Sequence, residues 1–148
     1  MEERISQYYK KLYHSYLQIF LTITGLSVVA AFVAWRFIDP AHYTISVGFH
    51  AVLVIYVIAN YFLTRVSFNG RMNDLKRVRD LSIKLDEYRE ANDIRWMLWA
   101  VVAFLAVVSM VVSGDLSFMA YIALSIGLLI KYFPFRDKVR RDLGIRQF

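Results

Sequence analysis

Four long apolar blocks constrain the fold of this chain more than any other feature of its sequence. They cover residues 17–38, 43–64, 94–113 and 116–133, and each contains 18 to 22 residues. A helix rises about 1.5 Å per residue, so each block is long enough to span the roughly 30 Å hydrocarbon layer of a bilayer. Apolar residues occur on every face of the expected helices, whereas the helices of a soluble bundle are apolar on one side. The blocks therefore predict transmembrane helices.

Strands are a poor alternative for these blocks. A membrane β-barrel needs short segments in which apolar and polar residues alternate, and residues 51–58 are apolar without alternation. In lipid the backbone groups find no outside partner, which leaves helices as the structure for such runs. We predict an all-α membrane protein in which residues 1–148 form a single integral membrane domain with four transmembrane helices.

Short turns at 39–40 and 113–115 predict that the spans pair as two helical hairpins. The polar segments 1–16, 65–93 and 134–148 then lie on the other side of the membrane. In the middle segment, apolar residues recur at spacings of three and four, namely Leu75, Val78, Leu81, Leu85 and Tyr88. This stripe predicts an amphipathic helix that joins the hairpins. A similar stripe in segment 1–16, which includes Tyr8 and Leu12, is expected to pack against it, unless the joining helix lies on lipid headgroups. The alternative function of the stripe is to dock a partner helix or a second copy of the chain.

The expected helix boundaries near this joint come from local signals. Asn69 and Gly70 predict a break after the second span or the start of the joining helix. Asn92 or Asp93 is expected to cap the helix that becomes the third span.

Basic residues predict the orientation in the membrane. Arg36 is the only one of the 18 Lys and Arg residues on the side of the two short turns, so the positive-inside rule places the polar segments and both termini in the cytoplasm. The net charge of +6 is then a topology signal and an attraction to anionic lipid headgroups rather than a sign of nucleic-acid binding. A basic tail is expected to rest on the lipid surface, and its residues are Lys131, Arg136, Lys138, Arg140 and Arg141.

His50 is the only ionisable side chain well inside a span, and such a residue is a functional candidate by default. On a helix, Ser46, His50, Asn60 and Thr64 lie near one line and form a thin polar stripe, which is expected to face the interior of the bundle. The other candidates for this polar group are Gln18 and Thr22 on the first span and Tyr121 on the fourth.

Two interpretations of this stripe remain open. In one, His50 titrates and the other side chains supply ligands along a proton or ion path. In the other, His50 is a neutral residue that fixes helix packing through hydrogen bonds to Tyr121 or Ser109. The second is favoured because proton relays also use a carboxylate within the membrane, and the spans contain none.

Catalytic and metal-binding motifs are absent from the sequence. It contains no cysteine, no His-Glu-x-x-His, no Gly-x-Ser-x-Gly and no glycine-rich phosphate loop. We therefore expect no catalytic residues, no cofactor and no metal site. Trp35, Trp96 and Trp99 lie near span ends and are expected to form an aromatic belt at the membrane surface.

Short motifs in the C-terminal part resemble those of a known group of proteins. The motifs are LDEYREA at 85–91, SGDL at 113–116, PFRDKV at 134–139 and RDL at 141–143. They resemble uncharacterised small four-span inner-membrane proteins of Bacteroidetes-type bacteria, in which a Thr is usual where this chain has Phe135. The resemblance covers about half of the chain. It implies four spans in a bacterial inner (plasma) membrane, and it implies no activity or site residues.

The expected function follows from this sparse chemistry. The sequence favours a non-enzymatic membrane protein that acts through helix packing and interaction, either with itself or as a subunit of an envelope complex. The alternative is a small ion or proton channel, or a transporter subunit, that uses the polar stripe around His50. An enzyme acting on membrane lipid is the least favoured class.

Overall fold

The computed structural model describes residues 2–37, 43–78 and 80–143, and these residues are almost entirely helical. The elements in chain order are α1 (Glu2–Phe37), α2 (Tyr43–Leu75), α3 (Leu81–Ser113), the 3-10 helix η1 (Leu116–Phe118), α4 (Met119–Lys131) and α5 (Arg136–Leu143). Within the described ranges no strand occurs. The predicted all-α fold is confirmed.

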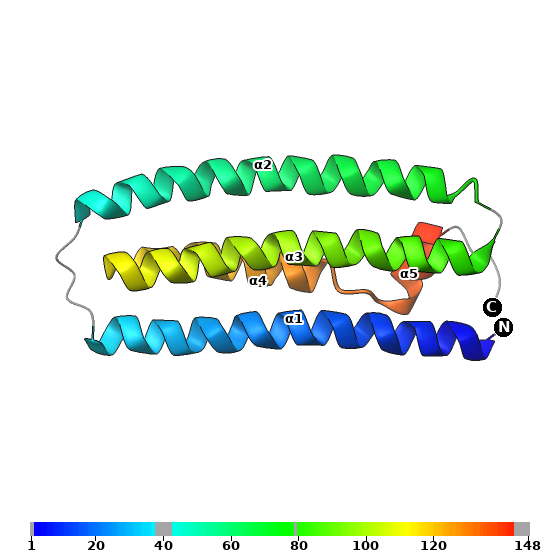
Figure 1. The fold of residues 1–148 in the computed structure, drawn as a ribbon, viewed down its shortest axis with the longest axis horizontal. Coiled ribbons are helices and arrows are strands. Elements are labelled where there is room, and N and C mark those ends of the chain that lie inside the picture. Colours follow the sequence, from blue (N-terminus) through cyan, green and yellow to red (C-terminus); the bar gives the residue numbers. More distant parts are fainter. Residues whose placement is uncertain (1, 38–42, 79, 144–148) are drawn as a thin grey trace.

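Three helices are long and apolar enough to cross a membrane. These stretches are Ser6–Arg36, Ser46–Leu75 and Leu81–Ser113, and the fourth apolar helix, Leu116–Lys131, is shorter. A helix of 33 residues, such as α2 or α3, measures about 50 Å, which exceeds the roughly 30 Å hydrocarbon layer. Each long helix therefore extends beyond its predicted span, and all three extensions lie at the same end of the bundle (Figure 1).

The joint between the second and third spans differs from the predicted amphipathic helix. Helix α2 continues through Asn69 and Gly70 to Leu75, the chain turns, and α3 begins at Leu81. A glycine inside a helix costs about 1 kcal/mol relative to alanine. Packing beyond Gly70 offsets this cost, because Met72 and Leu75 are buried in the core. The predicted stripe is thus divided between the end of α2 and the start of α3.

Helix α3 begins earlier in the sequence than predicted. Its N-cap is Asp80, which has an extended backbone and accepts a hydrogen bond from the Ser82 N–H at 2.9 Å. This bond satisfies a backbone donor that the first turn leaves unpaired. Asn92 and Asp93, the predicted caps, lie inside α3, where the Asn92 side chain donates to the Tyr88 carbonyl.

Helix α3 forms the centre of the bundle. It packs against α1, α2 and α4, whereas α1 and α2 are not a closely packed pair within the described residues. Figure 1 shows α1 and α2 on opposite sides of α3, with α4 behind it. Buried Ala103 and Ala106 on α3 allow neighbouring helices to approach closely. The predicted hairpin of the last two spans is a packed pair, and that of the first two is not. The turn predicted at 39–40 lies outside the described residues.

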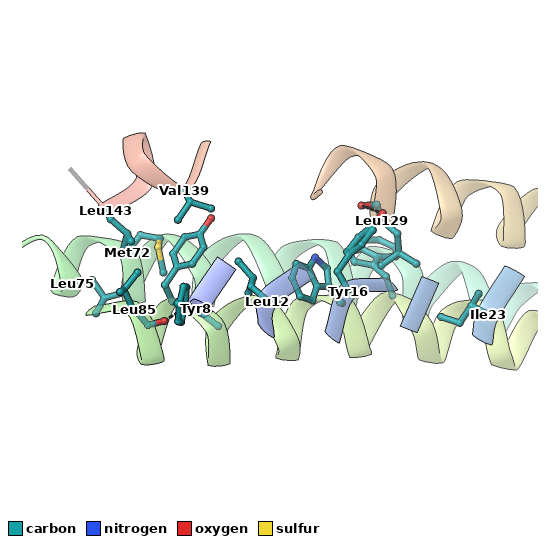
Figure 2. Close-up of a cluster of buried hydrophobic side chains, with 14 of the residues drawn as sticks. Tyr8, Leu12, Tyr16, Ile23, Met72, Leu75, Leu85, Leu129, Val139 and Leu143 are labelled. Atoms are coloured by element: carbon teal, nitrogen blue, oxygen red, sulfur yellow. Dashed lines mark hydrogen bonds between the residues drawn. The ribbon is translucent and has the colours of Figure 1, made fainter. Parts of the chain in front are cut away.

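The two ends of the bundle contain separate clusters of buried side chains. The proximal end holds the start of α1, the turn between α2 and α3, and α5; the distal end holds the start of α2, the end of α3, and η1 (Figure 1). Figure 2 shows part of the proximal cluster, which includes Tyr8, Leu12, Tyr16, Met72, Leu75, Leu85, Leu129 and Leu143. The distal cluster is smaller and contains Leu53, Met110 and Phe118 with several alanines.

Aromatic rings fill the proximal cluster. Trp96 and Trp99 are fully buried, so these two tryptophans are core residues and not part of the predicted surface belt. The Tyr16 ring lies edge-on to Trp96 and to Phe133, with centroids 5.2 and 4.9 Å away. Trp35 is 71% exposed and does lie at the surface.

Tyrosine hydroxyls attach α1 to its neighbours. The Tyr8 hydroxyl donates to the Leu85 carbonyl of α3, and the Tyr16 hydroxyl donates to the Leu129 carbonyl of α4 at 3.1 Å. The apolar stripe of segment 1–16 therefore packs inside the protein, against the start of α3.

Candidate functional site

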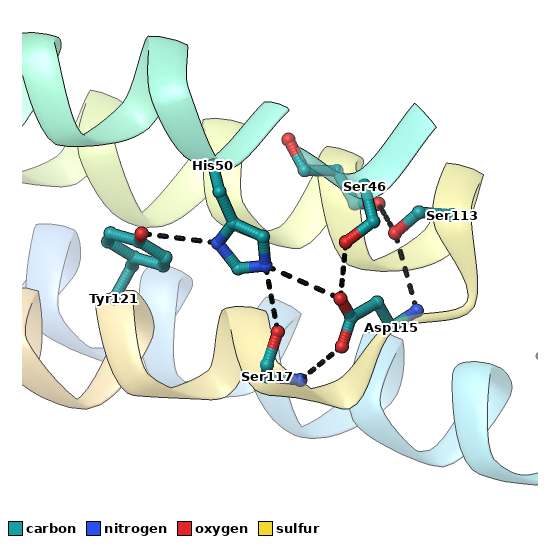
Figure 3. Close-up of polar contacts among 7 residues, drawn as sticks. Ser46, His50, Ser113, Asp115, Ser117 and Tyr121 are labelled. Carbon is teal, nitrogen blue, oxygen red and sulfur yellow. Dashed lines mark hydrogen bonds and ion pairs between the residues drawn. The ribbon is translucent and has the colours of Figure 1, made fainter. Parts of the chain in front are cut away.

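Polar side chains from α2, η1 and α4 meet at the distal end. The Nδ1 atom of His50 lies 3.1 Å from the Tyr121 hydroxyl. Its Nε2 atom lies 3.3 Å from the Oδ2 atom of Asp115 and 2.9 Å from the Ser117 hydroxyl. Ser46, one turn before His50, donates to the same Asp115 oxygen. Figure 3 shows these side chains pointing toward one another. We call the five residues the distal polar cluster.

Local turn geometry positions Asp115. Gly114 ends α3 in the left-handed conformation at φ 68°, which glycine adopts without steric cost. Asp115 then caps η1, because its Oδ1 atom accepts a hydrogen bond from the Ser117 backbone N–H at 2.8 Å. The tight turn predicted at 113–115 is present. Its carboxylate has a second role that the sequence did not reveal, as the partner of His50.

Hydrogen bonds keep Asp115 ionised. The Ser46 hydroxyl, followed by the side chain and backbone of Ser117, holds the pKa of this carboxyl below its ordinary value, with a smaller lowering from His50. Burial raises the pKa but is outweighed. The side chains of His50 and Asp115 are 29% and 25% exposed. The cluster therefore presents a stable negative charge to the imidazole of His50.

His50 can adopt either protonation state without losing a hydrogen-bond partner. In the neutral ring with a proton on Nε2, this N–H donates to Asp115 and the Tyr121 hydroxyl donates to Nδ1. In the charged ring both nitrogens donate, and the Tyr121 oxygen accepts instead. The Phe118 ring stacks on the imidazole, with centroids 4.1 Å apart and an angle of 8° between the planes. The stacked ring and the hydrogen bonds at both nitrogens hold the imidazole in one orientation.

The cluster lacks the geometry of a catalytic triad. In a triad the acid and the serine contact different nitrogens of the histidine, so that the acid orients the ring while the other nitrogen takes the serine proton. Asp115 and Ser117 contact the same nitrogen, Nε2. In the part of the chain that the structure describes, no group of three or more His, Asp or Glu side chains is arranged to hold a metal ion.

The structure divides the predicted polar stripe of the second span. Its distal half belongs to the distal polar cluster. In its other half, the Asn60 side chain donates to the Leu98 carbonyl of α3 at 3.0 Å, and the Thr64 hydroxyl donates to the Asn60 carbonyl at 2.8 Å. Buried Leu53 lies between the two halves along α2. Ser46, Asn60 and Thr64 are buried, so the stripe faces the interior of the bundle as expected, but its polar groups do not form a continuous line.

The candidate polar residues on the other helices do not all lie in the distal polar cluster. Tyr121 joins the distal polar cluster. Gln18 and Thr22 are exposed on α1 and line a groove between α1 and α3, away from the cluster. Ser109, the other proposed partner of the histidine, accepts a hydrogen bond from Ser113 through its backbone carbonyl.

The predicted basic tail is divided between the last residue of α4, Lys131, and the helix α5. The side chains of Lys131, Lys138 and Arg141 are described, and those of Arg136 and Arg140 lie outside the described residues. Val139 and Leu143 are buried in the proximal cluster, and the Lys138 ammonium donates to the Lys131 carbonyl at 3.1 Å. One face of α5 therefore packs on the protein, and Lys131 and Arg141 remain exposed.

A second candidate surface is the open face of α3. Large apolar side chains on it are 36 to 61% exposed and recur at spacings of three and four, and we call them the α3 stripe: Ile94, Met97, Val101, Phe104, Val108 and Val111. Helices α1 and α2 flank this face (Figure 1). A groove of about 380 Å³ separates it from α1. Sequence reasoning missed the stripe because a span that is apolar all round does not reveal which face its neighbours cover.

Comparison with family models, with curated proteins and with solved structures finds no match to this chain. Function is therefore inferred from the residues and their geometry. From the sequence, His50 and Tyr121 were identified as candidates, but Asp115 was assigned only to a turn. Both His50 and Asp115 lie close to a distal turn in the sequence, and this shared depth was the signal for their pairing.

Proposed function

We propose that this chain is a four-span protein of the bacterial inner membrane with both termini in the cytoplasm. Three helices long and apolar enough to cross support the membrane location. Among the described residues, every Lys and Arg except Arg36 lies toward the proximal end, and the positive-inside rule assigns such an end to the cytoplasm. The bacterial assignment follows the sequence resemblance.

Within that membrane, the protein acts by self-association through the open face of α3. The observation that carries this proposal is the spacing of the α3 stripe, which alternates between three and four residues over the length of a span. Such a repeat is typical of left-handed helix pairs whose side chains interdigitate. Membrane helices associate through close packing, because lipid tails are as apolar as the side chains. The groove beside the stripe provides a surface for such packing.

A second copy of the chain is the partner that this face fits. Two copies related by a twofold axis along the membrane normal place each stripe residue near the same residue of the other copy, at the same depth. The stripe contains no charged or hydrogen-bonding side chain, so the partner needs no complementary polar group.

Cysteine crosslinking in native membranes tests this proposal, and the natural chain contains no cysteine. Single variants Val101→Cys and Phe104→Cys are expected to form disulfide-linked dimers under mild oxidation. The matched control is Ile55→Cys on α2, which is 69% exposed. The hydrogen bond between Asn60 of α2 and Leu98 of α3 shows that these two residues lie at the same depth. Because α2 and α3 are antiparallel, Ile55 then lies at nearly the same depth as the two stripe positions.

The control decides between specific and random contact. Crosslinking at the stripe but not at Ile55 supports a dimer through α3. Equal crosslinking at all three positions indicates random collision, and no crosslinking at either stripe position removes the self-association proposal.

A second candidate function is a proton channel or a transporter subunit. The observation that favours it is the carboxylate of Asp115 beside His50, because proton relays combine such groups. The natural test is proton flux into proteoliposomes under a pH gradient. Flux that is lost in His50→Ala but kept in His14→Ala, an exposed histidine of α1, supports this function. Absence of flux in the natural chain, or flux unchanged in His50→Ala, excludes it.

A further inference from the structure

Arg95 is a buried cation near the proximal end of α3. The residue is only 6% exposed, and its guanidinium carbon lies 3.8 Å from the centre of the Phe68 ring and 4.2 Å from that of the Tyr132 ring. Its Nη2 atom donates to the Asn92 side chain. Its Nε atom is buried without a hydrogen-bond partner. Among the described residues no carboxylate forms an ion pair with Arg95.

A buried guanidinium without a counter-ion is expected to bind an anion. A guanidinium carries several N–H donors in a fixed planar fork, and one side-chain acceptor contacts it here. Burying a cation without a counter-ion is costly, and contacts with aromatic rings recover only part of that cost. Arginine also pairs with phosphate in a bidentate manner better than any other side chain.

A cavity between α2 and α3 gives access to this region. Its volume is about 240 Å³, and its lining includes Arg95, Arg71, Ser67 and Thr64. Arg71 contacts Glu90 at 3.2 Å, but these side chains are 38% and 62% exposed, and exposed ion pairs contribute little. Arg71 is therefore able to leave Glu90 for a stronger anion.

The surroundings carry excess positive charge. Burial, and then the charge of Arg95, lower the pKa of Lys138, while Asp142 acts in the opposite direction. The Lys138 ammonium lies 5.5 Å from the centre of the same Tyr132 ring that Arg95 contacts.

We propose that the cavity between α2 and α3 binds a phosphate group, with Arg95 and Arg71 as its charged donors and the Ser67 hydroxyl as a third. The depth of the cavity favours the phosphate of an anionic phospholipid over a soluble phosphate. On α2 it begins at apolar Leu63, which is 63% exposed, and it ends at Arg71, where the predicted span has given way to polar residues. This is the level at which lipid phosphates lie, on the side to which the basic residues point.

Lipid binding to the full-length chain in detergent tests the proposal. Phosphatidylglycerol, phosphatidylcholine and inorganic phosphate are titrated separately, bound lipid is counted by native mass spectrometry, and stabilisation by phosphate is followed by thermal unfolding. The natural chain is expected to retain phosphatidylglycerol. Arg71→Gln is expected to raise its half-saturating concentration about tenfold, the effect of losing one charge-assisted hydrogen bond. Arg95→Gln is expected to raise it further.

A matched control separates this site from general charge attraction. Arg65 is exposed on α2 and does not line the cavity, so Arg65→Gln is expected to leave binding unchanged. If Arg95→Gln does not fold, Arg71→Gln and Ser67→Ala still test the cavity. Equal losses in Arg65→Gln and Arg71→Gln, or no loss in Arg71→Gln, overturn the proposal. Stabilisation by inorganic phosphate that Arg71→Gln removes, without retention of phosphatidylglycerol, assigns the site to a soluble phosphate and overturns the lipid assignment.

Discussion

The distal and proximal ends of the bundle hold their helices together mainly by different contacts. At the distal end, α2 is joined to η1 and α4 by side-chain hydrogen bonds that centre on His50. At the proximal end, α1 is joined to α3 and α4 by buried rings, and the Tyr16 hydroxyl bonds to a backbone carbonyl. Hydrogen bonds of a histidine depend on its protonation, whereas burial of a ring does not. The contacts of the distal end therefore involve the charged carboxylate of Asp115, whereas the ring contacts of the proximal end are uncharged.

The largest expected effect comes from removing a proximal ring. Trp96→Ala leaves a cavity beside Tyr16 and is expected to reduce the free energy of unfolding by about 3–5 kcal/mol. The measurement is unfolding by denaturing detergent in mixed micelles, followed by circular dichroism. Trp35→Ala, at an exposed position, is the control. Equal effects of the two substitutions would show that the buried rings of the proximal end contribute no more to stability than an exposed ring.

Removing the centre of the distal polar cluster is expected to have an intermediate effect. His50→Ala loses contacts with Asp115, Ser117 and Tyr121, and side-chain hydrogen bonds in membrane proteins contribute about 0.6 kcal/mol on average. We expect a loss of about 1–2 kcal/mol in the same unfolding assay. His14→Ala should change the free energy of unfolding little. A loss as large as that of Trp96→Ala would erase the contrast between the two ends.

The pH dependence of stability sharpens the contrast. The pKa of Asp115 is lower in the folded chain than its ordinary value of 3.8, so the unfolded chain holds this proton more tightly. The resulting stabilisation is complete above the ordinary pKa and is lost as the pH falls through it toward the folded pKa. Asp115→Asn is expected to weaken the acid-induced fall in stability below about pH 4. Unfolding curves of both chains from pH 7 to pH 3 measure the difference, and parallel curves contradict the assignment.

The smallest expected effect belongs to an exposed ion pair of the proximal end. Glu90→Gln removes the contact with Arg71 and is expected to cost a few tenths of a kcal/mol, since exposed pairs contribute about 0.2–1 kcal/mol. The detergent unfolding assay measures it at low and at high salt. A loss above that of His50→Ala would mean that charge pairs, rather than rings, hold the proximal end.

The sequence predicted the helical fold because long apolar blocks leave few alternatives. It did not predict how the helices are arranged, because the few polar residues of blocks 17–38 and 43–64 indicate an inward face but not that both helices pack on α3 rather than on each other. The prediction for the joint between the second and third spans was wrong for a related reason. Local signals at Asn69, Gly70 and Asn92 were strong, but buried Met72 and Leu75 extend α2 past them, so tertiary packing outweighed propensity.

The distal polar cluster was predicted in part. His50 stood out because ionisable groups are rare within spans, and Tyr121 was one of two partners expected for it. Asp115 was found only as a turn residue, since its pairing with His50 joins positions 65 residues apart in the sequence. The α3 stripe and the ring contacts of Arg95 depend on how the helices pack, so no local sequence pattern predicts them.

The central place of α3 has a consequence for biosynthesis. In the proposed topology, once the growing chain has emerged from the ribosome as far as Leu75, its first two helices lie in the bilayer without the helix on which both pack. Helices α1 and α2 can reach their final positions only after the third helix has left the translocon. Until then they remain in the lipid without their packing partner. Nascent chains arrested at that point should be substrates for membrane-embedded chaperones and proteases, and chains extended through residue 113 should escape them.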